Sequence, residues 1–189
     1  MGYGSYRKEV IGKNNRVFIG KGTSLEHTVF RIVGENNTIF IGDNCRFGKG
    51  CSIWLEGNDV KITIGSNTSF TQYVHLNAQE EKSCITIGGG CMFSNSIIVR
   101  TSDSHPIFDV ETGKRLNSAK SVVIGNNVWV APDTKIMKGA IIGDGSIIGS
   151  NTMVGSVIPP NSLAVGMPAK VIRSNVRWTF QDVIFHKYE

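Results

Sequence analysis

The 189-residue sequence lacks the features that mark several common classes of protein. No stretch is apolar over the roughly 20 residues that a membrane helix needs, and the N-terminus has no apolar segment of signal-peptide length. The four cysteines and four histidines do not have the spacing of metal ligands. No basic run or aromatic RNA-binding signature accompanies the net charge of +5. We therefore expect a cytoplasmic protein that requires no metal, binds no nucleic acid and does not span a membrane.

The positions of the cysteines and glycines indicate instead a regular, compact architecture. Cys45 and Cys91 each follow an isoleucine by four residues, at positions where small inward side chains recur, so they are interpreted as core residues. The 22 glycines fall at regularly spaced positions and form no low-complexity run. A chain of this length fits one domain with a substantial core.

A six-residue repeat dominates residues 122–173. An aliphatic residue recurs at Ile124, Val130, Ile136, Ile142, Ile148 and Val154. Three residues later stand types that tolerate a left-handed backbone, at Asn127, Asp133, Gly139, Gly145 and Asn151. Two residues before each aliphatic stand small or β-branched types, at Val122, Val128, Thr134, Ala140, Ser146 and Thr152. This period predicts an all-β fold, a parallel β-helix whose triangular coils have three strands each.

The earlier part of the chain repeats the pattern more loosely, from about residue 10. The steps Ile19 to Ile41, Ile41 to Ile64 and Ile64 to Ile87 are 22, 23 and 23 residues, against 18 from Ile124 to Ile142. Polar segments at 56–59 and 78–83 are expected to hold the extra residues at one corner.

Two segments depart from the repeat altogether. The order disappears in 101–121, and a loop of this length in a compact repeat is usually functional. After Arg173, the spacing of Val176, Phe180, Val183 and Ile184 predicts a helix. The sequence thus divides into a β-helix domain, 1–173, and a helical cap, 174–189, that covers the end of the core.

Three segments carry a family resemblance: 124–129 (Ile-Gly-Asn-Asn-Val-Trp), 158–162 (Ile-Pro-Pro-Asn-Ser) and 166–173 (Gly-Met-Pro-Ala-Lys-Val-Ile-Arg). They resemble the hexapeptide-repeat acyltransferases, in particular the galactoside, maltose and capsular-sugar O-acetyltransferases, and the similarity extends over residues 60–173. The resemblance implies a left-handed coil, a homotrimer and acetyl-CoA as the acyl donor. The period alone implies neither the hand nor the trimer, since ordinary crossovers are right-handed.

The long loop contains the candidate catalytic residues. It opens with Thr-Ser-Asp-Ser-His-Pro at 101–106, where the fixed φ of Pro106 restrains the backbone after His105. A loop histidine taken alone is more often a solvated residue, but the resemblance implies that His105 is the catalytic base. Imidazole suits this role because its ordinary pKa is about 6.5. Asp103 or Asp109 could orient it, and Asp103 is preferred. No nucleophile elbow is present, so direct transfer without an acyl-enzyme is expected.

The donor site is predicted from stacking and from the resemblance. Eight residues past equivalent isoleucines stand Gln72, Asn95, Pro132 and Ser150, which should line one edge of the prism. The resemblance implies coenzyme A contacts at Pro132 and Ser150, with Asn95 near the thioester or acceptor. It also implies that Trp129, outward by the alternation, forms part of the pantetheine and acceptor cleft; packing at a trimer interface is the alternative.

For the anionic end of the cofactor, Lys170 and Arg173 match basic positions of the family, although two solvated charges are the alternative. The sequence departs from the family at Gly155 and Ser156, where relatives often have Thr-Lys before the Pro-Pro pair. One lysine contact is therefore missing, and Lys135 and Lys138 are candidates to replace it.

The acceptor side is expected in the coil before the loop, at Tyr73, His75 and Asn77. Tyr73 occupies the position where the resemblance implies an Asn, and His75 could serve as a donor or be a satisfied surface histidine. Glu80 and Glu81, in the adjoining insertion, could bind sugar hydroxyls or be solvated.

The leading hypothesis is transfer of an acetyl group to a sugar hydroxyl of a cell-surface polysaccharide precursor, with a small-molecule or a lipid-linked sugar as the acceptor. Acetylation of an amino sugar is the near alternative. A zinc carbonic anhydrase on this fold needs three clustered histidines, which the widely spaced His27, His75, His105 and His186 do not provide. A non-enzymatic binding scaffold needs neither the long loop nor the His-Pro pair.

Overall fold

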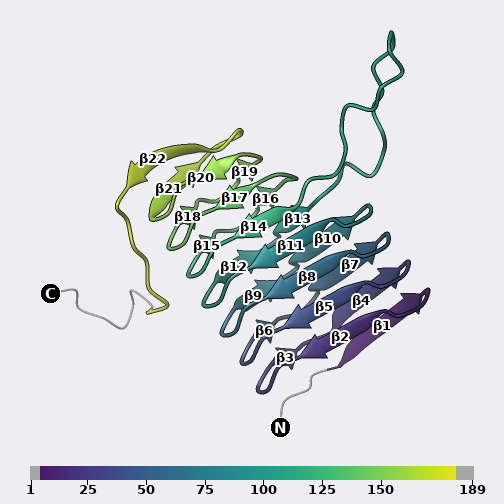
Figure 1. Ribbon diagram of the computed structural model, residues 1–189. Coiled ribbons are helices and arrows are strands. Elements are labelled where there is room, and N and C mark those ends of the chain that lie inside the picture. The colour runs from purple at the N-terminus through teal and green to yellow at the C-terminus, as the bar shows by residue number, and fades with distance from the viewer. Residues whose placement is uncertain (1–4, 182–189) are drawn as a thin grey trace, which may run out of the picture.

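The chain folds into a parallel β-helix built from three sheets that run the length of the molecule (Figure 1). The structure, a computed structural model, describes residues 5–181. From β1 to β21, successive strands pass from one sheet to the next, and strands one coil apart pair in parallel.

Sheet A has seven strands: β1 (Tyr6–Ile11), β4 (Thr28–Val33), β7 (Ser52–Glu56), β10 (His75–Gln79), β13 (Ile98–Arg100), β16 (Lys135–Ile136) and β19 (Met153–Val154). Sheet B also has seven: β2 (Arg16–Ile19), β5 (Thr38–Ile41), β8 (Lys61–Ile64), β11 (Cys84–Ile87), β14 (Val122–Ile124), β17 (Ile141–Ile142) and β20 (Val157–Ile158). Sheet C has eight: β3 (Ser24–Leu25), β6 (Arg46–Phe47), β9 (Ser69–Gln72), β12 (Met92–Asn95), β15 (Trp129–Val130), β18 (Ile147–Ile148), β21 (Ser162–Val165) and β22 (Lys170–Ser174).

The predicted six-residue columns are confirmed. The aliphatic column from Ile124 to Val154 and the small column from Val122 to Thr152 are both buried in the prism. The turn column adopts positive φ at Asn127, Asp133, Gly139, Gly145 and Asn151, and the earlier copies do the same at Asn14, Gly22, Asn44, Asn67 and Gly90. Left-handed residues at each corner turn the chain from one sheet to the next, which is why Asn, Asp and Gly recur there.

The core is a stack of aliphatic side chains with an aromatic ladder in the earlier coils. Phe70 stacks between Phe47 and Phe93, with ring centroids 4.5 and 4.8 Å apart. Cys45, Cys51 and Cys91 are buried, as the sequence predicts for Cys45 and Cys91. Burial raises the pKa of the Cys91 thiol to about 11, so this thiol is a core residue rather than a nucleophile.

The corner between sheets A and B carries the irregular segments. Residues 57–60 and 80–83 connect β7 to β8 and β10 to β11, where the extra residues of the longer coils are expected. One coil later the same corner holds the loop 101–121, which leaves the wall between β13 and β14 and projects from the body of the molecule (Figure 1). Its tip is a small hairpin with one antiparallel bridge, Phe108 to Arg115.

The end of the chain differs from the sequence-based prediction. In place of a helix from residue 174, β22 turns back antiparallel to β21, and residues 175–181 continue without helix beside sheet C (Figure 1). The apolar side chains of Val176 and Phe180 have the spacing of a helix, but the N–H of Val176 donates to the carbonyl of Asn161 and Trp178 packs on Trp129 instead. Val183 and Ile184 lie outside the described residues. Among residues 5–181 no helix has the length and hydropathy needed to cross a membrane.

Candidate active site at the loop 101–121

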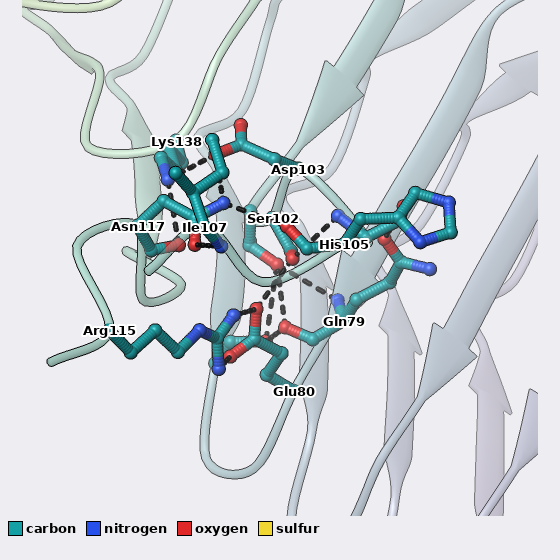
Figure 2. A network of polar contacts seen from close by, with 12 residues as sticks. Gln79, Glu80, Ser102, Asp103, His105, Ile107, Arg115, Asn117 and Lys138 are labelled. Carbon is teal, nitrogen blue, oxygen red and sulfur yellow. Dashed lines mark hydrogen bonds and ion pairs between the residues drawn. The ribbon is translucent and has the colours of Figure 1, made fainter. Parts of the chain in front are cut away.

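The base of the loop is held by a carboxylate in the preceding coil. Glu80 accepts two hydrogen bonds from the guanidinium of Arg115, each 2.8 Å long, and a third of 2.6 Å from the hydroxyl of Ser102 (Figure 2). The fork of Arg115 holds the pKa of Glu80 below its usual range, against the opposing effect of burial. The two ends of the loop are thus tied to one side chain, in the bidentate geometry that favours arginine over lysine.

A second cluster fixes the segment around His105. Lys138 Nζ and Asn117 Nδ2 donate to Asp103 Oδ2 at 2.5 and 2.9 Å. The same amide of Asn117 donates to the carbonyl of His105 at 2.9 Å, while its oxygen accepts from the Ile107 N–H at 2.7 Å. The hydrogen bond from Lys138, followed by that from Asn117, lowers the pKa of Asp103. Asn117 therefore clamps the backbone on both sides of the His-Pro pair.

His105 is exposed at the rim of the wall, and its imidazole points away from the carboxylate of Asp103 (Figure 2). Within residues 5–181 no hydrogen bond joins the two side chains; Asp103 engages Lys138 and Asn117 instead. The other candidate, Asp109, accepts from the backbone and hydroxyl of Thr112 and forms a turn near the loop tip. The role of Asp103 as partner of His105 stays a prediction.

The predicted acceptor residues lie on the outer face of sheet A, next to the loop. His75 faces outward, its Nδ1 lies 2.7 Å from the hydroxyl of Ser52, and its ring packs edge-on against Trp54. Burial, followed by the charge of Arg100, lowers the pKa of His75. Asn77 is almost completely buried on the same face. Tyr73, in contrast, is an exposed corner residue at φ 51° between β9 and β10.

The predicted cofactor column is present at the corner between sheets C and A. Backbone hydrogen bonds join consecutive coils through this corner: Ser96 N to Gln72 O, Asp133 N to Asn95 O and Asn151 N to Pro132 O. Gln72, Asn95, Pro132 and Ser150 therefore stack as predicted, one above another.

Trp129 lies outward on sheet C, as the alternation predicts, but it is partly covered by the end of the chain. Trp178 packs against it with ring centroids 6.1 Å apart, donates Nε1–H to the carbonyl of Asn127 at 2.6 Å, and contacts Phe180. The indole nitrogen of Trp129 is buried and has no hydrogen-bond partner within residues 5–181. A ligand that reaches this cleft would find an unsatisfied donor there.

The remaining predicted cofactor residues are distributed over two parts of the prism. Gly155 and Ser156 are exposed between β19 and β20, at the corner that carries the His105 loop two coils earlier. Lys170 and Arg173 are exposed on β22, at the end of sheet C. Sheet A separates the His105 corner from the column of Pro132, so a single chain does not bring the predicted base and the whole predicted donor site together.

Comparison with known proteins places this geometry in a family. Residues 121–156 match the family described as bacterial transferase hexapeptide (six repeats). The polysialic acid O-acetyltransferase of Neisseria meningitidis is 34% identical over 177 residues, which cover 89% of this chain and 77% of the relative. The chain belongs to the hexapeptide-repeat O-acetyltransferases. The polysialic acid O-acetyltransferase of Escherichia coli O1:K1 is 40% identical over 134 residues, 71% of this chain, but the matched part spans only 42% of that longer protein.

Solved structures agree with membership of this acetyltransferase family. The polysialic acid O-acetyltransferase OatWY superposes with a TM-score of 0.81 and 28% identity over 96% of this chain and 94% of that chain. This similarity identifies the coil as the left-handed parallel β-helix. An acetyltransferase of Vibrio cholerae, solved with acetyl coenzyme A, matches 64% of each chain at 25% identity and a TM-score of 0.50. Within residues 5–181 of this acetyltransferase, no group of three His, Cys, Asp or Glu side chains could hold a metal ion.

Sequence reasoning missed the residues that hold the acetyltransferase loop in place. Arg115 and Asn117 lie in a segment without repeat order, so no column predicts their partners. Glu80 was considered as a ligand for sugar hydroxyls and Lys138 as a substitute cation for coenzyme A, yet both form ion pairs with the loop. The only available signal was that Glu80 lies one coil before the loop at the same corner.

Proposed function

We propose that this acetyltransferase transfers the acetyl group of acetyl-CoA directly to a hydroxyl of a cell-surface polysaccharide or its precursor, with His105 as the general base. The observation that carries the proposal is the loop itself: a network of Glu80, Arg115 and Asn117 presents His105 at the rim of the wall. The named activities of the Neisseria and Escherichia relatives support a hydroxyl of an acidic capsular glycan as the acceptor.

The chemistry needs one proton shuttle and no covalent intermediate. The imidazole of His105 accepts the proton of the acceptor hydroxyl while its oxygen attacks the thioester carbon. The carbon–oxygen bond forms, the carbon–sulfur bond breaks, and the imidazolium returns the proton to the leaving thiolate. Asp103 forms an ion pair with Lys138. After rotation of the imidazole toward it, the carboxylate of Asp103 would also orient His105 and stabilise the imidazolium.

A complete site requires a second subunit. His105 lies at the corner between sheets A and B, whereas Trp129, Pro132 and Ser150 lie on sheet C and at its corner with sheet A. A neighbouring copy that packs against the loop supplies the missing wall. The exposed apolar residues of the loop tip support this arrangement: Ile107, Phe108, Leu116 and Val110, the last 98% exposed.

The outer face of sheet B supports a homotrimer. One register row across it reads Phe18, Phe40, Thr63, Thr86, Val123, Ile141 and Val157, and all five apolar members are exposed. A continuous apolar and β-branched stripe along a flat sheet is suited to self-association. The four free cysteines fit a reducing, cytoplasmic location, where acetyl-CoA is available.

Release of coenzyme A thiol tests the proposal. The wild-type protein, given acetyl-CoA and capsular oligosaccharides, should release thiol only with the acceptor present. The His105→Ala variant should lose about 10² to 10⁴ in rate, the usual contribution of a general base, while its coenzyme A affinity and melting temperature change little. His27→Ala is the matched control, because His27 is an exposed histidine in the first coils.

Retention of most of the turnover by His105→Ala would remove the assignment of the base. Acetyl transfer to an amine in place of a hydroxyl, read by product analysis, would replace O-acetylation with N-acetylation. A stable, active monomer in sedimentation would refute the shared site.

A further inference from the structure

Within residues 5–181, every half-buried cation is paired with a carboxylate except Arg100. Arg31 pairs with Glu56, Arg115 with Glu80 and Lys138 with Asp103. Arg100, the last residue of β13, has no carboxylate partner within residues 5–181.

The only side-chain hydrogen bond of Arg100 in that range runs from its terminal nitrogen to the hydroxyl of Ser104, 2.7 Å away. Its Nε is buried and has no partner. A partly desolvated guanidinium without a counter-ion is costly, so this position is suited to an anion that arrives with a ligand.

Arg100 belongs to a row of three residues that each have a buried polar atom without a hydrogen-bond partner. In the parallel register of sheet A, Arg100 pairs with Asn77, and Asn77 pairs with Trp54. Each of the three carries one buried polar atom without a partner in the described chain: Arg100 Nε, Asn77 Oδ1 and Trp54 Nε1. Asn77 is only 7% exposed. Since buried polar groups are nearly always satisfied, three adjacent exceptions in one row indicate a binding site.

The row has a defined pattern of chemistry. Neighbouring strands of a sheet lie about 4.8 Å apart, so a donor, an acceptor and a donor follow one another over roughly 10 Å. The guanidinium of Arg100 matches a carboxylate, the amide oxygen of Asn77 accepts from a hydroxyl, and Trp54, whose ring lies under the guanidinium of Arg31, offers an N–H. A sugar that carries both a carboxylate and hydroxyls presents this combination.

The position of the row connects it to the loop. Arg100 directly precedes the loop, and its partner Ser104 is the residue before His105. We propose that the row Trp54, Asn77 and Arg100 is a subsite for an acidic sugar of the acceptor glycan, with the sugar carboxylate on Arg100. This inference rests on the proposed acetyl transfer to a glycan, because it assigns the face on which the acceptor chain lies.

Neighbouring groups favour a sugar over the other available anions. The neighbouring carboxylates Glu56, Glu80 and Asp103 are already engaged by Arg31, Arg115 and Lys138, so in the described part of the chain none of these three forms an ion pair with Arg100. The basic pair predicted for the phosphates of coenzyme A, Lys170 and Arg173, lies on β22 at the far end of sheet C. The apolar stripe proposed for self-association lies on sheet B, so a neighbouring copy has a different face to cover.

Binding of two matched oligosaccharides tests the subsite without relying on acetyl transfer. The probes are an oligomer of sialic acid and the same oligomer with its carboxylates reduced to alcohols, titrated into the full-length protein. Arg100→Gln should weaken binding of the acidic oligomer about 10- to 100-fold, as expected for a charge-assisted contact, and leave the reduced oligomer nearly unaffected. Arg100→Lys should recover part of the loss. Arg46→Gln, an exposed arginine on sheet C, is the control with the same change in charge.

A second variant tests the row independently of charge. Trp54→Phe keeps an aromatic face but removes the N–H, and it should weaken both oligomers by a similar factor of about 2 to 10. Melting temperatures of all variants identify any that lose the fold; if Arg100→Gln does so, Trp54→Phe carries the test of the row.

Several results would overturn the subsite. Equal loss for both oligomers in Arg100→Gln would mean that Arg100 acts through packing. Loss of coenzyme A affinity would assign Arg100 to the donor phosphates, and loss of the oligomeric state in sedimentation would assign it to a carboxylate of a second copy. No loss for either oligomer would place the glycan elsewhere.

The two proposals fail in distinguishable ways. If the protein transfers acetyl groups to the oligomer but Arg100→Gln does not discriminate, only the subsite is wrong. If the acidic oligomer binds through Arg100 but no transfer to any glycan occurs, the subsite stands and the proposed function is wrong.

Discussion

The wall of the prism and the loop 101–121 are stabilised by opposite means. In the wall, the buried positions are occupied by aliphatic, aromatic and small side chains that stack from coil to coil. In the loop, the buried residues are Thr101, Ser102 and Asn117, all polar, and the large apolar side chains of the tip are exposed. The loop is held at its base by Glu80 and by the pair of Asp103 with Lys138.

This difference separates stability from activity. Deleting buried apolar atoms from the wall costs both transfer free energy and a cavity, and it affects the whole cooperative unit. Deleting a polar tether of the loop releases one segment while the core keeps its packing. Four changes test this separation, from the largest expected effect to the smallest.

Removal of a core ring should produce the largest loss of stability. Phe70→Ala takes away the middle ring of the stack with Phe47 and Phe93, and the free energy of unfolding should fall by about 3 to 5 kcal/mol. Denaturant unfolding measures it, and Phe70→Leu, which keeps most of the volume, should lose less. A loss below about 1 kcal/mol for Phe70→Ala would show that the wall relaxes around the cavity.

Release of the loop should reduce transfer while leaving the wall intact. Glu80→Gln removes the charge that binds Arg115 and Ser102, so His105 loses its fixed position; transfer should fall about 10- to 100-fold. The melting temperature should change far less than in Phe70→Ala. Glu81→Gln is the control, since Glu81 is exposed and its one ion pair within residues 5–181 is with the adjacent Lys82. A parallel fall in stability and transfer would show that the loop and the wall unfold together.

Acid should weaken the loop tethers before it affects the core. The pKa values of Glu80 and Asp103 are lower in the folded protein than in the unfolded chain, because Arg115 and Lys138 favour the ionised forms. Their stabilisation is therefore complete above the unfolded values of about 4 and is lost as pH falls through the folded values. The slope of unfolding free energy against pH below about 4 should be smaller in the double variant Glu80→Gln with Asp103→Asn. An unchanged slope would assign the acid sensitivity to other carboxylates.

The smallest effect is expected at the end of the solenoid. Lys170→Ala combined with Arg173→Ala should weaken coenzyme A binding more than pantetheine binding, by at most about tenfold in low salt and less in physiological salt, because both residues are exposed. Ser156→Lys, which introduces the lysine that the family resemblance implies at this position, should tighten coenzyme A binding. Titration of both ligands measures this. Equal losses for coenzyme A and pantetheine would mean that the basic pair acts through folding.

The repeat explains why so much of the fold was predictable. A residue such as Asn127 or Val128 has counterparts at the same place in every coil. The six-residue pattern therefore predicts at once whether a residue lies at a corner, which way its side chain faces and whether it is buried. The stacking of Asn95 with Pro132 is predicted in the same way, because both residues stand eight positions after equivalent isoleucines. The predicted helix is absent from residues 175–181: Val176 and Phe180 have helical spacing, but Trp178 between them packs on Trp129. The rest of the predicted cap lies outside the described residues.

The sequence by itself determined the β-helix and the position of the loop, because these depend on local periodicity, whereas His105 is a candidate base only through the family resemblance. Only the tertiary structure decided which side chains hold the loop and which lack partners. Glu80 and Arg115 are 35 residues apart, and the row of Trp54, Asn77 and Arg100 spans three coils. Such contacts depend on how many residues each coil contains and on which corner carries the insertion. The length of each coil and the place of the insertion set which residues of neighbouring coils lie side by side. The six-residue hydrophobic period does not encode which polar side chains pair between coils.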